Sequence, residues 1–264
     1  MFRTVSSEFY RLKKSTGFWI MILIAAALAI FTSVVFGLLP ILIPGEDFTG
    51  LAPASVSEFL NGAMGANVSN ILFILVGFTI VFINSDFTSG TVRNPLSIGI
   101  SRIEYYVGKF STILVICGAF VVVTLLGTTL PYFFFEPWGD AFSFVPFISG
   151  VGLGYLILVT QTTLFVCIAL MVRKVGATLG IIIGYLVLDM IISGFVMVVT
   201  MTTELNPALR GFLNIFPTSG GFYLDAVSQG TADVGNVMLL IGVSITVIVT
   251  MSLLAIRSLT KKDV

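Results

Sequence analysis

Six long runs of apolar residues alternate with short polar stretches along this chain. A helix needs about 20 apolar residues to cross the hydrocarbon core of a bilayer. The pattern therefore predicts an all-α integral membrane protein, with residues 1–264 forming a single transmembrane domain. We expect the six transmembrane helices over residues 17–39, 67–84, 110–134, 147–172, 175–200 and 236–257.

The segment before the first predicted span mixes apolar and basic positions. Phe2, Val5, Phe9 and Leu12 recur at spacings of three and four, with basic residues between and after them. This periodicity favours an N-terminal amphipathic helix that lies in the membrane interface, near anionic lipid headgroups. A straight extension of the first span explains the pattern equally well.

The connection between the fifth and sixth spans, about 201–235, is too apolar for a plain solvated loop. It is also interrupted by Pro207, Pro217, Gly220 and Gly221, so it is too broken for a further span. We expect short external re-entrant helices that dip into the outer edge of the membrane.

The basic residues are distributed unevenly between the two sides of the membrane. With six spans, twelve of the thirteen Lys and Arg residues fall on the side of the two termini, and Arg210 alone falls opposite. Cytoplasmic loops of membrane proteins carry such an excess of basic residues. Both termini are therefore predicted to be cytoplasmic, in a multi-pass protein of the plasma membrane.

Composition agrees with a lipid environment and narrows the function. Only 10% of residues are charged and 57% are hydrophobic, whereas about a quarter of a soluble domain is charged. The net charge of zero gives no basic surface for a nucleic-acid partner. The absence of histidine removes the commonest metal ligand and the Ser-His and Cys-His catalytic pairs. Cys117 and Cys167 lie in apolar runs and are expected to be packing residues.

Small residues form a ladder in the fifth predicted span. Gly176, Gly180 and Gly184 recur every four residues on one face of the expected helix. Such ladders let helix backbones approach closely inside a membrane. The neighbour is either another span of this chain, which we expect, or a second copy.

A cytoplasmic connection of mixed character joins the second and third spans, over residues 85–108. Gly90, Pro95 and Gly99 interrupt it, and aliphatic side chains such as Leu96 alternate with polar ones. A segment of this kind is suited to docking a soluble partner, or to resting as an amphipathic elbow on lipid headgroups.

The ordered motifs of this connection resemble those of permeases of the type-2 ATP-binding-cassette (ABC) exporter family. That family has an acidic residue four before Gly-Thr, then a basic-hydrophobic stretch, Ser-Arg, and Gly-Lys or Ser-Lys. The matching positions are Asp86, Gly90-Thr91, Arg93 with Leu96, Ser101-Arg102 and Gly108-Lys109. The N-terminal segment Glu8–Lys14 followed by Phe18-Trp19 is also similar. Two positions depart from the family pattern: Asp86 replaces the commoner Glu, and Pro95 predicts a shorter or kinked docking helix.

The resemblance implies a division of labour between chains. A separate cytoplasmic ATPase would bind ATP and Mg²⁺, and this chain, with no catalytic residue, cofactor or metal of its own, would pair with a second permease chain, identical or different. The 2–3 connection would be the coupling helix, and its ATPase-coupling residues would be Asp86, Gly90, Thr91, Arg93, Leu96, Ser101 and Arg102. Independently, the chain has no phosphate-binding Gly-x-x-x-x-Gly-Lys-Ser/Thr loop. At Gly108-Lys109, Ile103 stands where the first glycine of that motif would be, and Phe110 stands where its Ser or Thr would be.

One acidic residue, Asp189, lies well inside the fifth predicted span. A charge at this depth costs about 3 kcal/mol on insertion scales, so it should face protein or water. Tyr185 and Ser193 lie four residues to either side on the same helical face. These three residues either line a transport pathway or fix helix packing through hydrogen bonds.

The function predicted from these features is that of a permease subunit of an ABC exporter, in a bacterial plasma membrane. Its substrate would be hydrophobic or amphipathic, and peptide export is one activity linked to similar permeases. Ion-coupled transport through Asp189 and a non-transporting membrane anchor remain as alternatives. An intramembrane hydrolase is disfavoured, because the spans contain no histidine and no pair of acidic residues.

Overall fold

The computed structural model describes residues 2–42, 56–88, 100–134, 142–200 and 234–261. Within these ranges the chain is helical apart from short turns and contains no strand. The all-α class predicted from the sequence is confirmed for this part of the chain. The helices are α1 (Phe2–Lys14), α2 (Thr16–Leu42), α3 (Val56–Thr88), α5 (Arg102–Tyr132), α6 (Phe144–Val172), α7 (Val175–Thr200) and α10 (Val234–Lys261).

Five of the six predicted spans coincide with helices long and apolar enough to cross a membrane. The remaining predicted span, 67–84, lies within α3, where the described apolar segment Ile74–Phe87 is shorter than a span. The protein is therefore a multi-pass membrane protein, and the count of six stays a prediction. The five long apolar segments are Thr16–Val35, Arg102–Pro131, Phe144–Val172, Val175–Ile192 and Val237–Thr260.

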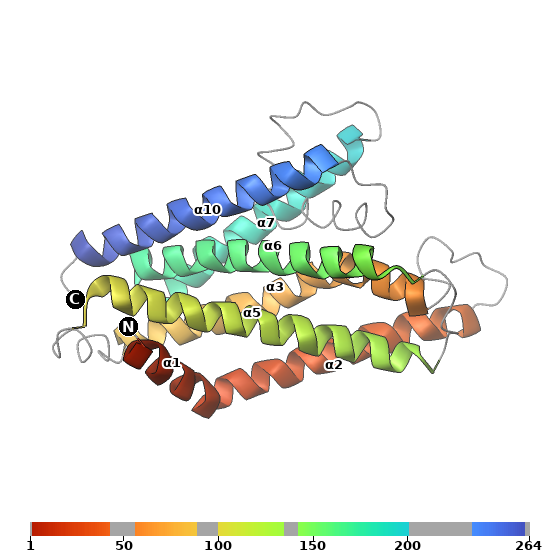
Figure 1. Ribbon diagram of the computed structural model, residues 1–264, viewed down its shortest axis with the longest axis horizontal. Helices are drawn as coiled ribbons and strands as arrows, with labels where there is room; N and C mark the ends of the chain where they lie inside the picture. The colour runs from red at the N-terminus through yellow and green to blue at the C-terminus, as the bar shows by residue number, and fades with distance from the viewer. Residues whose placement is uncertain (1, 43–55, 89–99, 135–141, 201–233, 262–264) are drawn as a thin grey trace.

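The long helices form a bundle in which α6 is central. Helix α5 lies between α2 and α6, and α6 lies between α5 and α10 (Figure 1). Helices α3 and α7 form a second layer, with α3 packed on α6 and α5, and α7 packed on α3 and α6. Phe120, Leu158 and Phe165 are fully buried in the core. Exposed apolar side chains cover the outer faces of α2, α7 and α10, as contact with lipid requires.

Helices α1 and α2 are separate elements that meet at Ser15. The Ser15 hydroxyl accepts a hydrogen bond from the Phe18 backbone N–H at 3.4 Å, which caps the start of α2. The two helices join at a clear angle (Figure 1). The straight extension of the first span is therefore wrong, and the placement of α1 in the membrane interface stays a prediction.

One end of the bundle gathers the described basic residues. Helix α1, the start of α5, the turn between α6 and α7, and the last turn of α10 all lie at this end (Figure 1). We call it the charged end; it carries Arg11, Arg102, Lys109, Arg173 and Lys174. The predicted re-entrant helices of the 201–235 connection lie outside the described residues, apart from the first two residues of α10.

Close helix approach in this bundle depends on a glycine that the sequence did not single out. A Cβ at Gly127 of α5 would lie 2.9 Å from Ala29 Cβ of α2, so only glycine allows this crossing. By contrast, a Cβ at Gly176, Gly180 or Gly184 would meet no atom within 4 Å among the described residues. The expected packing of this ladder within the chain is therefore not found in the part of the chain that the structure describes.

Candidate functional site

A buried lysine joins three helices at the charged end. Lys109 of α5 is 1% exposed, although lysine is almost never fully buried unless it is paired. Its Nζ lies 2.7 Å from Glu8 Oε2 of α1 and 2.6 Å from Asp86 Oδ2 of α3. One ammonium group therefore pairs with two carboxylates that come from two different helices, α1 and α3, both earlier in the sequence than α5.

Asp86 has two further partners in this cluster. The Arg11 guanidinium of α1 donates a hydrogen bond to Asp86 Oδ1, and the Tyr105 hydroxyl donates one to Oδ2 at 3.0 Å. Together, Glu8, Arg11, Asp86, Tyr105 and Lys109 form what we call the ionic clasp. Two positive and two negative charges balance within it, as burial of charged groups demands.

Aromatic rings enclose the cations of the clasp. The Lys109 Nζ lies 4.5 Å from the centre of the Phe82 ring, and the Arg11 Cζ lies 5.2 Å from the same ring. Ring faces attract cations, and the effect strengthens where water is excluded. Phe82 lies one helical turn before Asp86 on α3, so this helix supplies both the anion and the ring.

The clasp shifts the pKa of its members outside the spans in the directions that strengthen pairing. Burial tends to raise the pKa of the Asp86 carboxyl, but the hydrogen bond from Arg11 and the charge of Lys109 outweigh it, and the pKa is lowered. Burial likewise tends to lower the pKa of the Arg11 guanidinium, and its contact with Asp86 raises it overall. Both groups therefore stay charged at neutral pH.

Close packing brings α1 near enough to α5 for the clasp to form. A Cβ at Gly108 would lie 3.2 Å from the Thr4 Cγ2 of α1. Thr4, Glu8 and Leu12, spaced four residues apart, are all buried against the bundle. Val5 and Phe9 are only half-buried, so the face of α1 that docks is centred on Glu8, with Thr4 and Leu12 one turn to either side.

Ser101 and Arg102 secure helix ends in this structure. The Ser101 hydroxyl accepts from the Glu104 backbone N–H at 3.2 Å, and the Glu104 side chain accepts from the Ser101 N–H. This reciprocal capping box starts α5. Arg102 donates to the carbonyls of Leu259 at 2.5 Å and Thr260 at 2.6 Å, which satisfies the last turn of α10.

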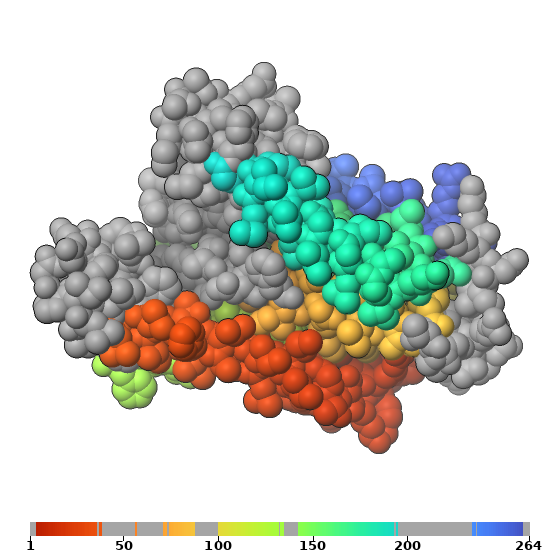
Figure 2. All heavy atoms as spheres, turned by 180° about the vertical axis from the view of Figure 1, so that it is seen from behind, coloured from red at the N-terminus to blue at the C-terminus, as the bar shows by residue number. Residues whose placement is uncertain are grey.

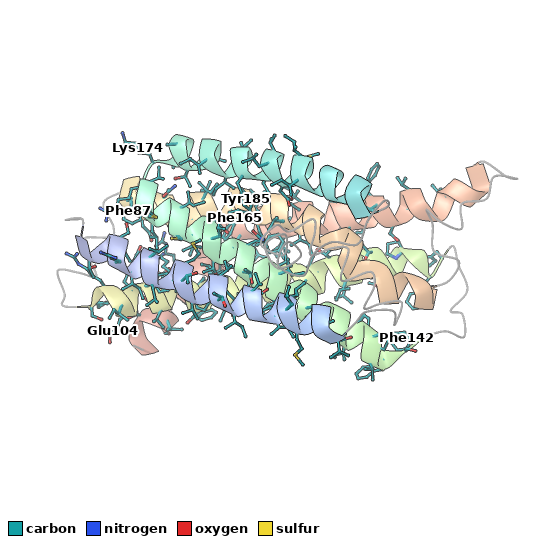
Figure 3. All side chains as sticks on the ribbon, turned by 90° about the horizontal axis from the view of Figure 1, so that it is seen from above. Phe87, Glu104, Phe142, Phe165, Lys174 and Tyr185 are labelled. Carbon is teal, nitrogen blue, oxygen red and sulfur yellow. The ribbon has the colours of Figure 1, made fainter. Side chains whose placement is uncertain are left out.

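The last turn of α3 contacts the rest of the bundle in several directions. Asn84 Nδ2 donates to Thr178 Oγ1 of α7 at 3.1 Å. Phe87 stacks under the guanidinium of Arg173, which ends α6 in the left-handed conformation at φ 59°. Figure 3 shows Phe87, Lys174 and Glu104 together at the charged end, with Phe142 at the other end. Residues 84–87 therefore connect α3 to α1, α5, α7 and the α6–α7 turn.

The structure describes some of the ATPase-coupling residues predicted from the sequence and not others. Asp86, Ser101 and Arg102 flank a predicted docking segment whose residues Gly90, Thr91, Arg93 and Leu96 lie outside the described residues. The Asp86 side chain is 2% exposed, so it acts through its helix contacts rather than by touching a soluble partner. The pairing of Glu8, Tyr105 and Lys109 with it was not predicted, although Lys109 at the edge of an apolar run was a signal.

A second polar group lies deeper in the bundle, around Asp189 of α7. Asp189 is buried, and the Tyr185 hydroxyl, one turn away, donates to Gln161 Oε1 of α6 at 2.9 Å. The Tyr185 ring also meets Phe165 edge-on at 5.9 Å, visible between α6 and α7 in Figure 3. Ser193 lies on α7, but its side chain is outside the described set. Gln161 was not predicted, because one glutamine in an apolar run has no periodicity that reveals its partner.

Neither polar group has the composition of a metal centre. No group of three or more Asp, Glu, Cys or His side chains comes together among the described residues. The ionic clasp holds helices in fixed relative positions, and the Asp189 region offers hydrogen-bonding groups at membrane depth.

A comparison with models of protein families finds a match that covers most of the chain. A family model described as ABC-2 family transporter protein matches residues 4–191, which is more than half of the chain and includes every residue of both polar groups except the neighbouring Ser193. A search of curated proteins finds no matching sequence.

Proposed function

Because this chain belongs to the ABC-2 transporter family, we propose that it is the membrane-spanning permease subunit of an ATP-driven exporter. A separate cytoplasmic ABC ATPase would bind ATP and Mg²⁺, and two permease chains, identical or different, would form the transport unit. The substrate would be hydrophobic or amphipathic, with peptides as one class. The charged end would face the cytoplasm of a bacterial cell, in agreement with the basic bias of that end.

The observation that carries this proposal is the convergence of three distant motifs in the ionic clasp. The N-terminal segment supplies Glu8 and Arg11, the end of α3 supplies Asp86, and the start of α5 supplies Lys109. The last two flank the predicted docking segment on either side. A clasp at this place would hold both flanks rigid, so that force applied to the segment by an ATPase reaches the spans.

A capture experiment tests the proposal. The tagged chain would be extracted in mild detergent, and its partners identified by mass spectrometry. We expect to recover an ABC ATPase with the wild-type chain and to lose it with Arg93→Ala/Leu96→Ala, which removes two side chains of the predicted docking segment. Neither residue belongs to the ionic clasp, so the loss would not come from a broken clasp. Lys174→Ala, an exposed charge at the same end, is the matched control and should retain the ATPase. Absence of any ATPase from the wild-type capture would contradict the proposal.

A second candidate function rests on the burial of Asp189 in α7. Buried acids in membrane helices often carry protons or bind ions, so ion-coupled transport through Asp189 is the alternative. Transport that depends on a proton gradient, persists without the ATPase and fails in Asp189→Asn would favour it. Normal transport by Asp189→Asn would exclude it.

A further inference from the structure

The buried face of α7 is unusually polar for a membrane helix. Thr178, Ile182, Tyr185, Leu186 and Asp189 point into the bundle, at the three- and four-residue spacings of one helical stripe. Three of these five residues carry polar side chains. Between Thr178 and Asp189 the stripe extends roughly 16 Å along the helix axis, from the charged end to membrane depth.

Polar residues of α3 and α6 face this stripe. Asn84 of α3 is 0% exposed and bonds to Thr178, and Gln161 of α6 is 1% exposed and bonds to Tyr185. We call Asn84, Gln161, Thr178, Tyr185 and Asp189 the polar seam. Each member is more than nine-tenths buried except Tyr185, which is half-buried. Polar groups at such positions are costly in lipid and are usually retained for function.

Among the described residues, helix α7 makes limited packing contacts with the rest of the bundle. It packs on α3 and α6, and its outward glycines Gly176, Gly180 and Gly184 meet no described atom within 4 Å of an added Cβ. In the space-filling view from behind, α7 lies at the surface with α3 visible between it and α2 (Figure 2). The α2–α5 crossing is closed more tightly, through Gly127 and Ala29. Within the part of the chain that the structure describes, separation of α7 therefore disturbs less packing than separation of α2 and α5.

The seam begins beside the ionic clasp. Asn84 lies two residues before Asp86 in the last turn of α3, so both are fixed to the same rigid segment. A displacement of the docking segment would move this turn and, through the Asn84–Thr178 hydrogen bond, the start of α7. This is a direct mechanical link between the clasp and the seam.

From these observations we propose that the polar seam is the route for the polar, cationic part of an amphipathic substrate, opened by a shift of α7. A carboxylate, an amide and hydroxyl groups accept hydrogen bonds and favour positive charge. The apolar part of the substrate would stay against the exposed aliphatic surface of α7 and the lipid. The proposal rests on the proposed function, because ATP hydrolysis by the partner supplies the shift.

Thiol labelling in membrane vesicles tests the route without knowledge of the natural substrate. Thr178→Cys, Tyr185→Cys and Leu186→Cys place thiols on the seam face, and Leu186→Cys removes no polar bond. Ile181→Cys and Ile183→Cys are matched controls on the outer face of α7. The wild-type chain sets the background, because Cys117 and Cys167 are buried. The reagent is a charged methanethiosulfonate, applied with and without ATP.

We expect seam thiols to react at least about tenfold faster than the controls, because the reactive thiolate forms only where water enters. ATP should change the seam rates severalfold. Dodecyltrimethylammonium below its micellar concentration should slow the labelling of seam thiols, and dodecanoate at the same concentration should not.

Three results would decide against parts of this account. Seam labelling no faster than the wild-type background or the outer-face controls, with and without ATP, would overturn the route. Equal protection by dodecyltrimethylammonium and dodecanoate would overturn its cationic selectivity. Fast seam labelling that ATP does not change would support a hydrated route but contradict the ATP-driven function.

Discussion

At the scale of single residues, Lys109 is predicted to contribute strongly to stability. Its ammonium is the shared partner of Glu8 and Asp86, and it is almost completely buried. Removing one partner of a buried ion pair leaves uncompensated charge and typically costs about 3–5 kcal/mol. Lys109→Met should therefore lower the thermal unfolding midpoint of the chain in nanodiscs, whereas Lys174→Met at an exposed site should not.

Because the charges of the ionic clasp balance, Glu8→Gln should partly restore the stability that Lys109→Met removes. With Lys109→Met alone the ionic clasp carries an excess negative charge, but Glu8→Gln combined with Lys109→Met leaves only Asp86 and Arg11, which pair with each other. We expect the double variant to unfold at a higher temperature than Lys109→Met. A double variant that is less stable would show that charge balance is not what the clasp provides.

The lowered pKa of Asp86 predicts how the clasp responds to pH. Asp86 lies beyond the predicted span 67–84. Among the described residues, Arg11, Tyr105 and Lys109 contact its carboxylate, and Glu8 shares Lys109 with it. Because its folded pKa is below the unfolded value of about 4, its stabilising contribution is complete above that pH and is lost as the pH falls through the folded value.

Trp19, whose indole donates to the Lys13 carbonyl at 2.9 Å, reports on the junction of α1 and α2. Its fluorescence in a Trp138→Phe background should be constant from pH 8 to about pH 5 and change only below about pH 4. A transition between pH 5 and pH 7 would contradict the assignment of Asp86 as a charged member of the clasp.

At the scale of helices, the α2–α5 crossing depends on Gly127. A Cβ there would lie 2.9 Å from Ala29 Cβ and 3.4 Å from the Ala26 carbonyl oxygen, so the backbones would have to separate. We expect Gly127→Ala to destabilise the bundle by about 1–3 kcal/mol, the usual cost of overpacking. In the same helix, Gly118→Ala meets Tyr155 Cε2 at 3.8 Å and should be neutral or slightly stabilising. Denaturant unfolding in matched micelles would compare the two, and equal stability would contradict the close crossing.

Helices were the level of structure that the sequence predicted best. Long apolar runs are a strong signal, so the predicted spans 147–172 and 175–200 match α6 and α7 within three residues at every end. The extension of α3 back to Val56 was not predicted, because residues 56–66 mix Gly, Ser, Glu and Asn with apolar positions. The boundary at Ser15 was also open, since a single serine does not reveal whether a helix bends or continues.

The candidate sites could be predicted only in part, for a physical reason. Lys109 pairs with Glu8 across 101 positions of the chain, and Tyr185 pairs with Gln161 across 24. Local periodicity gives the face of a helix but not which neighbour that face meets. The resemblance to exporter permeases marked Asp86 and Lys109 as motif residues, and the structure explains them as partners of each other.

At the scale of the whole molecule, this ABC-2 family protein contains two polar groups at different depths of the bundle. The ionic clasp fixes α1, α3 and α5 at the charged end, and the polar seam continues from it along α7. In this account, an ATPase acts on the predicted docking segment, the clasp keeps that segment's flanks rigid, and α7 responds. The central claim is that the soluble partner binds at the charged end.

Photo-crosslinking in living cells tests this claim most directly. A photoreactive amino acid would replace Leu96 in the docking segment, or Phe142 at the opposite end of the bundle as the matched control. The account predicts that position 96 crosslinks to an ABC ATPase and that position 142 does not. A crosslink to the ATPase from position 142, or none from position 96 when the chain is folded in the membrane, would contradict it.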